Sequence, residues 1–182
     1  MRIGILSDTH GDLKAFEQAL VAMGTCDFYL HAGDVLYHGP RNNLPVGYGP
    51  KELAERIKSM NNIYFVHGNC DADVDEMVTE QDLSHDWRLV ELDGYKFFMI
   101  HGYKESVTSR IAKAKEQGAD LLIYGHTHVK ELYKDGNLIC LNPGSPAIPK
   151  DGSASVAVFE DGRVRLIDLA THQTIAALTV ER

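Results

Sequence analysis

The stretch at residues 3–10, IGILSDTH, joins an apolar run to two polar side chains, Asp8 and His10. The same arrangement returns along the chain, where an apolar, β-prone run ends in Gly-Asp, Gly-Asn, His or Gly-His. The further runs are FYLHAGD (28–34), IYFVHGN (63–69), FFMIH (97–101) and LLIYGH (121–126). Because open α/β sheets build their sites at strand ends, these polar groups are expected to meet at one edge of a sheet.

Hydrophobic periodicity around these runs predicts an α/β fold. Helices are expected from residue 13 to the closing Gly24, from Pro50 to Met60, and near 105–117. Strands are expected at 1–8, 27–33, 63–67, 87–92, 95–101, 120–124, 130–134, 138–141, 155–160, 163–169 and 174–180. Three Asp-Gly pairs, at 93–94, 135–136 and 161–162, indicate hairpins. Parallel βαβ units joined to such hairpins suggest two mixed sheets packed face to face, with helices outside.

Length and composition indicate one globular domain over residues 1–182. The chain is 44% hydrophobic and 24% charged, with no apolar run long enough for a membrane helix and no signal-peptide pattern. The cysteines are odd in number and lack CxxC spacing, so a disulfide framework or thiolate zinc site is not expected. A cytoplasmic location fits best. Residues 35–49 form a Gly- and Pro-rich loop of a length that is usually functional or disordered.

The polar groups at the strand ends have the chemistry of a two-metal hydrolytic centre. Asp8 and His10 lie two apart at the end of the first strand, so alternation is expected to place both side chains on one side, within reach of one cation. Asp34 has two carboxylate oxygens and could bridge two cations about 3.5–4 Å apart. Each group alone could be a helix cap, a turn or a core histidine, but their recurrence in order favours metal binding. The candidate ligands are Asp8, His10, Asp34, Asn69, His101, His126 and His128.

The net charge of −8, from 26 acidic and 18 basic residues, argues against a polyanionic partner. Non-specific nucleic-acid binding depends on Lys and Arg that neutralise phosphates, and the chain has no basic stripe. Two divalent cations would nevertheless make one point of this acidic chain attractive to a small phosphate anion. A small substrate is therefore expected, with neither membrane nor strong nucleic-acid binding; a homo-oligomer is possible.

The series DxH…GD…GN…H…GHxH resembles that of the calcineurin-like metallophosphoesterase superfamily, over almost the whole chain. Residues 38–48 and 68–75 look most like the small bacterial phosphodiesterases of the YfcE type. The resemblance implies a four-layer α/β/β/α sandwich. It also implies that one metal is bound by Asp8, His10, Asp34 and His128. The second metal would be bound by Asp34, Asn69, His101 and His126.

One position departs from the family pattern. Most members have a histidine after the Asn, near the leaving-group oxygen, where this chain has Cys70. A thiol is mostly protonated at neutral pH and hydrogen-bonds weakly, so esters that need strong leaving-group protonation should react poorly. Whether Cys70 is an acid, a spacer or a redox-sensitive thiol stays open, with spacer as the default interpretation. The residues expected nearest the reacting phosphoryl group are Asp34, Asn69, Cys70 and His38.

Other residues carry weaker signals. His38 and Arg41 lie in the loop after Asp34, where an Arg could fork onto phosphate oxygens; loop packing is the alternative. Asp71 is expected to orient a ligand or fix its loop. His31 is expected in the core. Ser145 belongs to an Asn-Pro-Gly-Ser sequence that is expected to form a tight turn, with contact to phosphate as the alternative.

The function that these patterns favour is hydrolysis of small phosphodiesters by a water or hydroxide that bridges two divalent metals. The oxygen and imidazole ligands suit Mn²⁺ best, with Mg²⁺, Fe, Co²⁺, Ni²⁺ or Zn²⁺ as possible occupants. One alternative is a phosphomonoesterase such as a protein Ser/Thr phosphatase. Another is a non-catalytic scaffold like the phosphoesterase-like subunit of retromer.

Overall fold

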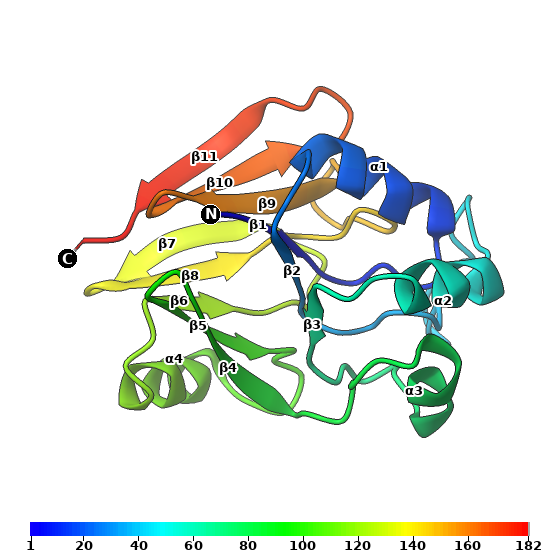
Figure 1. Cartoon of the computed structure of the whole chain (residues 1–182), viewed down its shortest axis with the longest axis horizontal. Helices are drawn as coiled ribbons and strands as arrows, with labels where there is room; N and C mark the ends of the chain where they lie inside the picture. Colours follow the sequence, from blue (N-terminus) through cyan, green and yellow to red (C-terminus); the bar gives the residue numbers. More distant parts are fainter. Residues whose placement is uncertain (182) are drawn as a thin grey trace.

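The computed structural model describes residues 1–181, which form two β-sheets packed face to face (Figure 1). The six-stranded sheet comprises, in spatial order, β11 (Thr174–Thr179), β10 (Arg163–Asp168), β9 (Ser155–Glu160), β1 (Arg2–Leu6), β2 (Phe28–His31) and β3 (Ile63–Phe65). The five-stranded sheet comprises β4 (Trp87–Leu92), β5 (Tyr95–Ile100), β6 (Leu121–Ile123), β8 (Leu138–Asn142) and β7 (Glu131–Asp135). Both sheets mix parallel and antiparallel pairs, as predicted.

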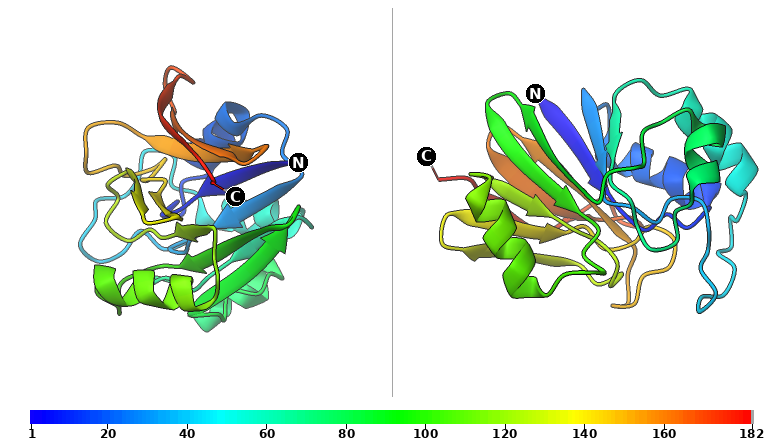
Figure 2. Two further views of the ribbon diagram at one scale, coloured as in Figure 1. Left: turned by 90° about the vertical axis from the view of Figure 1, so that its left-hand side faces the viewer. Right: turned by 90° about the horizontal axis from the view of Figure 1, so that it is seen from below.

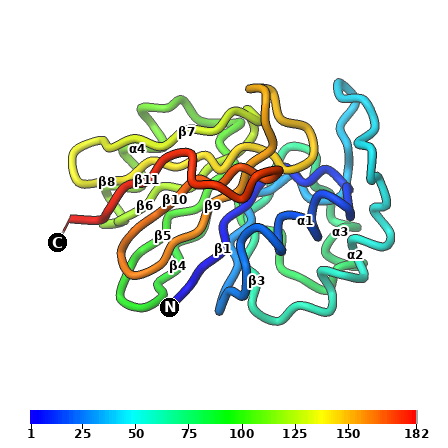
Figure 3. Tube along the Cα trace, turned by 90° about the horizontal axis from the view of Figure 1, so that it is seen from above, coloured from blue at the N-terminus to red at the C-terminus, as the bar shows by residue number. Residues whose placement is uncertain are grey.

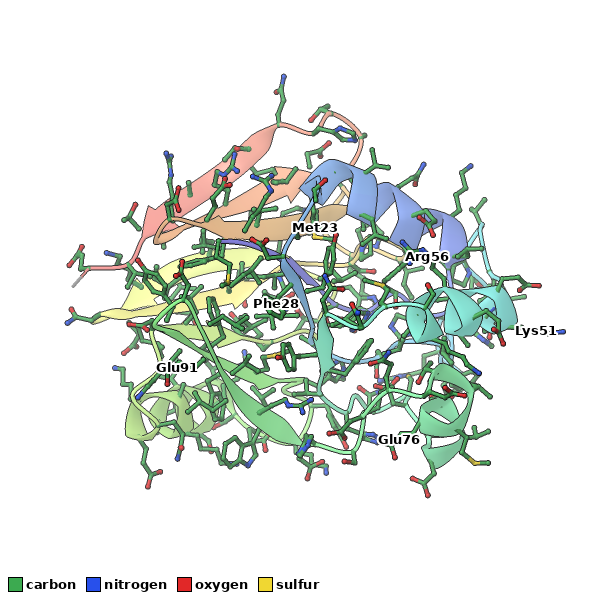
Figure 4. All side chains as sticks on the ribbon, viewed as in Figure 1. Met23, Phe28, Lys51, Arg56, Glu76 and Glu91 are labelled. Atoms are coloured by element: carbon green, nitrogen blue, oxygen red, sulfur yellow. The ribbon has the colours of Figure 1, made fainter. Side chains whose placement is uncertain are left out.

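Helices cover the outer faces of both sheets (Figures 1 and 2). The helices are α1 (Leu13–Met23), α2 (Pro50–Lys58), α3 (Asp73–Thr79) and α4 (Val107–Glu116). The first two pack on the six-stranded sheet, and Arg56, labelled in Figure 4, joins them by an ion pair to Glu17 at 2.8 Å. Helix α4 packs on the five-stranded sheet. The layers therefore follow the order α/β/β/α, which confirms the predicted fold.

Strict alternation along the strands separates the layers of the core. Ile3 and Ile5 of β1 lie between the sheets, whereas Leu6 faces the helices of the first outer layer. Phe97 of β5 also lies between the sheets, while the next residue, Phe98, faces α4. The sandwich thus has three apolar layers. None of the helices within residues 1–181 combines the length and apolarity that a bilayer crossing requires.

Helix α3 was not predicted from the sequence. It is short, its first turn is acidic, and its apolar residues Val74, Met77 and Val78 are exposed, so no core-facing periodicity marks it. A local interaction fixes its start instead: the carboxylate of Asp75 accepts a hydrogen bond from the backbone N–H of Ala72 at 2.9 Å. Two of the three Asp-Gly turns, at 93–94 and 161–162, have positive φ at both residues, as tight hairpins require.

Neighbouring parallel strands end at the same edge of their sheet, and the loops that follow these strands begin at that edge. Strands β1, β2 and β3 run parallel in one sheet, and β5 and β6 run parallel in the other. Strand β1 ends at Leu6, however, so Asp8 and His10 lie in a loop. The expectation that strand alternation brings these two side chains together is therefore wrong.

The core between the sheets supports a stability prediction. We expect Phe97→Ala to lower the free energy of unfolding by about 3–5 kcal/mol, because a fully buried ring is removed and a cavity remains. Phe97 is 0% exposed and meets the ring of Phe159 edge to face at 5.1 Å. Urea denaturation followed by circular dichroism measures the change. The control Val46→Ala, at a side chain 98% exposed, should change stability by less than about 0.5 kcal/mol. Equal losses in both variants would contradict this account of the core.

Candidate metal centre

Most of the candidate ligands sit on left-handed backbone. Five of them have positive φ, between 46° and 70°. These residues are Asp8, His10, Asp34, His126 and His128. Asp and His tolerate this region better than most non-glycine residues, yet it stays costly by about 1–3 kcal/mol each. Such a concentration of strained backbone indicates a site whose side-chain directions matter more than local stability.

Glycines before the ligands permit close approach of the loops. A Cβ atom at Gly68 would overlap the backbone nitrogen and carboxylate of Asp34. A Cβ at Gly125 would overlap the side chains of Ser7 and Asp8. The Gly-Asn and Gly-His pairs of the sequence are therefore explained by packing: only glycine lets these loops lie against the Asp-bearing loops.

Asp71 holds two of the ligand loops together. Its carboxylate accepts hydrogen bonds from the backbone N–H groups of Asp34 at 2.9 Å, Val35 at 2.7 Å and Gly68 at 2.8 Å. The three donors leave this buried carboxylate well satisfied. The predicted role of Asp71 in fixing a ligand loop is confirmed.

Three imidazoles are oriented in the same way, because each Nδ1–H donates to a backbone carbonyl oxygen. The pairs are His10 with Tyr37 at 2.7 Å, His101 with Ala32 at 2.7 Å, and His128 with Ile148 at 2.8 Å. A carbonyl oxygen can only accept, so Nδ1 carries a proton in each ring and the Nε2 atom points inward, where it offers a lone pair whenever the ring is neutral. The Nε2 atoms of His10 and His128 are only 3.0 Å apart.

The carboxylates face the same point. The Oδ1 atom of Asp8 is buried without a hydrogen-bond partner, and it lies 3.2 Å from Nε2 of His128 and 3.6 Å from Nε2 of His10. The Oδ2 atom of Asp34 lies 3.6 Å from Nε2 of His10 and 3.3 Å from Nε2 of His101. Oxygen and nitrogen lone pairs that converge in this way repel one another unless cations lie between them, so the residues present fit divalent metals.

The charges of the cluster agree with this reading. Burial alone would raise the pKa of Asp8, but the neighbouring imidazoles of His10, His101 and His128 lower it well below its usual value. Burial likewise disfavours charge on His101, yet Asp34 and Asp8 raise the pKa of this imidazole to about 9. The fold thus keeps two buried carboxylates ionised, and buried anions require cationic partners.

Asn69 and His126 complete the cluster on its open side. The Oδ1 atom of Asn69 is 2.7 Å from Nδ1 of His126 and 3.2 Å from Nε2 of His101. The structure thus brings all seven candidate ligands to one place. Three groups of residues hold possible ligand atoms within 4.8 Å of one another: Asp8, His10 and His128; Asp8, Asp34 and His101; and His10, Asp34 and Cys70.

Cys70 lies at the mouth of the cluster. Its backbone N–H donates to Oδ1 of Asp34 at 2.8 Å, and its thiol accepts a hydrogen bond from the Asn69 amide at 3.3 Å. Burial, followed by the negative charge of Asp34, raises the pKa of the Cys70 thiol to about 12. The group is therefore neutral at physiological pH.

A cavity of about 330 Å³ opens from the cluster to solvent. Ligand side chains form its floor, and the loop after Asp34 forms much of its rim, including Arg41. His38 is not among the lining residues; its ring packs edge-on against Tyr37 and Tyr48. The structure therefore places Arg41 on the cavity, whereas the His38 ring packs within its own loop.

The sequence analysis missed several residues of this site. Tyr37, Asn42 and Lys150 also line the cavity. No sequence signal marks Lys150, which lies 22 residues after the last candidate ligand, His128. Tyr37 matters through its backbone carbonyl, which any residue type would provide.

His31 and Ser145 are structural. Nδ1 of His31 accepts from the backbone N–H of Gly33, and burial lowers the pKa of the ring to about 3, so this core histidine stays neutral. Ser145 is fully buried, and its hydroxyl donates to the carbonyl oxygen of Asp8 at 2.8 Å. That hydroxyl also accepts from the backbone N–H of Ile148 at 2.9 Å, so Ser145 braces ligand loops and is not open to phosphate.

Comparison with known proteins gives matches along nearly the whole chain. The family description "calcineurin-like phosphoesterase superfamily domain" matches residues 1–161. The chain is 35% identical over 184 residues to the phosphodiesterase YfcE of Escherichia coli K12, with 99% of this chain and 98% of that protein covered. It is 28% identical over 153 residues to a phosphodiesterase of Methanocaldococcus jannaschii, with 79% and 83% covered.

Solved structures of other proteins have the same fold. The E. coli phosphoesterase YfcE matches with a TM-score of 0.87 and 32% identity over 100% of both chains. Vps29 of Entamoeba histolytica, solved in complex with zinc, matches with a TM-score of 0.70 and 16% identity over 100% of both chains, which shows a shared fold alone. The family match and the full-length identity to YfcE, on the same sandwich, show that this chain belongs to the calcineurin-like phosphoesterase superfamily.

Proposed function

We propose that this protein is a metal-dependent phosphodiesterase that hydrolyses small phosphodiesters at the cluster of converging ligands. The observation that carries the proposal is the buried, unpartnered Oδ1 atom of Asp8, which faces the inward Nε2 atoms of His10 and His128. A carboxylate oxygen in that setting is suited to a cation. Two relatives named as phosphodiesterases, from E. coli and M. jannaschii, support the reaction class.

The proposed ligand sets divide the cluster in two. Asp8, His10, Asp34 and His128 would hold one cation, and Asp34, Asn69, His101 and His126 the other, with Asp34 between them. When bound, two divalent cations would lower the pKa of the attacking water and offset charge on the phosphoryl oxygens. The backbone carbonyls behind the imidazoles keep the ligand nitrogens aimed inward, and Asp71 fixes the loop of Asp34. Arg41, on the cavity rim, would orient the substrate.

Mn²⁺ is the proposed occupant. The seven candidate ligands offer carboxylate, amide and imidazole atoms and no thiolate, a set that suits Mn²⁺ while admitting Mg²⁺, Fe, Co²⁺, Ni²⁺ or Zn²⁺. The Cys70 thiol does lie near Asp34 and His10, but its raised pKa makes thiolate ligation unfavourable.

A phosphomonoesterase is the nearest rival function, and a scaffold is the other. The neutral thiol of Cys70 at the cavity mouth disfavours the monoesterase, because it is a poor proton donor to a departing alkoxide. The intact ligand set disfavours a scaffold. Since a Vps29 of this fold has been solved with zinc, metal content alone does not separate scaffold from enzyme, whereas turnover does.

Substitution of the bridging candidate tests the ligand assignment. We expect Asp34→Asn to lower diester hydrolysis at least about a hundredfold, since losing even a residue behind the ligands costs about 10–100-fold. Asn also tolerates positive φ, so the fold should persist by circular dichroism. The matched control is Asp161→Asn, at an exposed hairpin residue with a φ of 50°. Folded Asp34→Asn protein with near wild-type turnover would refute the assignment.

Removal and return of metal test the cofactor. We expect chelation to abolish hydrolysis and Mn²⁺ to restore it best. Because metal binds the native state alone, Mn²⁺ should also raise the melting temperature, and Asp34→Asn should weaken that rise. Elemental analysis must confirm removal. Full turnover by protein free of metal would exclude the mechanism.

The residue at position 70 should set the preference between diesters and monoesters. We expect the wild type to favour the diester, and Cys70→His to raise monoester turnover relative to diester turnover. General acid catalysis is typically worth about 10²–10⁴-fold, so even a partly placed imidazole should be visible. Steady-state kinetics on matched nitrophenyl mono- and diesters measure the ratio. A wild type that prefers the monoester, or a ratio unchanged by the substitution, would contradict this role.

A further inference from the structure

Two cationic side chains from distant parts of the chain line the cavity above the ligand cluster. Arg41 belongs to the loop after Asp34, and Lys150 follows the Asn142–Ser145 turn. Figures 2 and 3 show these two segments, coloured blue and orange, at the same side of the molecule. Neither Arg41 nor Lys150 is a candidate metal ligand, so the proposed metal binding does not explain their positions.

Hydrogen bonds to His128, a candidate ligand, fix the position of Lys150. The backbone N–H of Lys150 donates to the carbonyl oxygen of His128 at 3.0 Å, while the ring of His128 donates to the carbonyl of Ile148 at 2.8 Å. The hydroxyl of Ser145 in turn accepts from the N–H of Ile148. These bonds fix the segment from Ser145 to Lys150, so the Lys150 side chain leaves the backbone from a defined point on the rim.

The nearest carboxylate in the sequence does not neutralise Lys150. Asp151 forms an ion pair with Lys130 at 2.7 Å and accepts the backbone N–H of the same residue at 2.7 Å. Within residues 1–181, no ion-pair partner is found for the side chain of either Lys150 or Arg41. Both residues are exposed, and in this chain of net charge −8 they meet at one cavity without an ion-pair partner in the described part of the chain.

Charge balance indicates what these cations bind. Two divalent metals with Asp8 and Asp34 would leave about two positive charges at the cluster, which already exceed the single charge of a phosphodiester. Arg41 and Lys150 would then be surplus for a substrate with one anionic group. A second anionic group on the substrate would restore the balance.

We propose that Arg41 and Lys150 form a second anion subsite, which selects small phosphodiesters bearing a carboxylate or phosphate on one esterified group. This inference rests on the proposed phosphodiesterase function and names its substrate class. The cavity of about 330 Å³ is in the range of small-ligand sites and has room for more than a phosphate group. The acidic chain selects against long polyanions, so the second anion belongs to a small molecule.

A series of diesters with one leaving group tests the subsite. The substrates are 4-nitrophenyl phosphates whose second ester is butyl, 3-carboxypropyl, 3-phosphonopropyl or 3-(trimethylammonio)propyl. With Mn²⁺-loaded wild-type protein, we expect kcat/KM for both anionic esters to exceed that for the butyl ester by about three- to tenfold, and the cationic ester to be poorest. The preference should shrink with added salt. A carboxylate preference without a phosphonate preference, or the reverse, identifies the group that is bound.

Variants locate the effect. Lys150→Gln and Arg41→Gln should each lower the ratio of anionic to neutral kcat/KM by at least about threefold, and Lys150→Arg should keep most of it. The matched control is Lys51→Gln, which removes the same charge from an exposed residue of α2 outside the cavity, labelled in Figure 4. A control that lowers the ratio as much as Lys150→Gln would assign the effect to net charge and overturn the subsite.

Binding without turnover gives an independent measurement. Calorimetric titration with the corresponding non-hydrolysable phosphonates should show tighter binding of the anionic analogues to the wild type, and a clearly smaller difference between the two kinds with Lys150→Gln. Equal rates and equal affinities for all esters, in protein that hydrolyses them with Mn²⁺, would overturn the subsite while leaving the proposed function intact. Tighter binding of the anionic analogues without hydrolysis of any ester would support the subsite and refute the enzyme.

Discussion

Mutual repulsion among lone pairs is the constraint on which the rest of the site depends. The Nε2 atoms of His10 and His128 lie 3.0 Å apart, and a buried carboxylate oxygen of Asp8 faces both without a hydrogen-bond partner among the described residues. Left to relax, such groups would turn away from one another or take up protons. Carbonyl oxygens behind the rings prevent rotation, because each holds the Nδ1–H of its imidazole. The fold thus keeps in place an arrangement that becomes favourable only around cations.

The sandwich supplies that rigidity through its strand ends. The parallel strands of both sheets release their loops at carboxyl ends, and their alternating side chains pack into apolar layers on both faces. Against this firm support, the ligand loops carry left-handed residues and glycines that let backbones nearly touch, as at Gly68 beside Asp34. The stability of the apolar core therefore offsets the conformational cost of the left-handed residues in the ligand loops, as is common at functional sites.

We assign substrate selection to residues at the open side of the same cluster. Cys70 places a neutral thiol at the cavity mouth, which in the proposed reaction would favour esters with good leaving groups. Around the mouth, Arg41 and Lys150 add positive charge that the ligand cluster does not use. In the proposed function, the chemistry of hydrolysis and the choice of substrate would thus belong to different residues, which allows them to be tested separately.

The sequence alone determined the sheets, the helices with apolar faces, and the seven candidate ligands, because each depends on local periodicity or on a short motif. It could not reveal α3, whose apolar residues are exposed and whose start depends on Asp75 and a backbone N–H. Nor could it show that β1 ends before Asp8, since left-handed backbone is imposed by packing against neighbouring loops. The separation of His38 from the cavity and the arrival of Lys150 at its rim were decided by the tertiary structure alone, because contacts between segments far apart in the chain leave no periodic trace in the sequence.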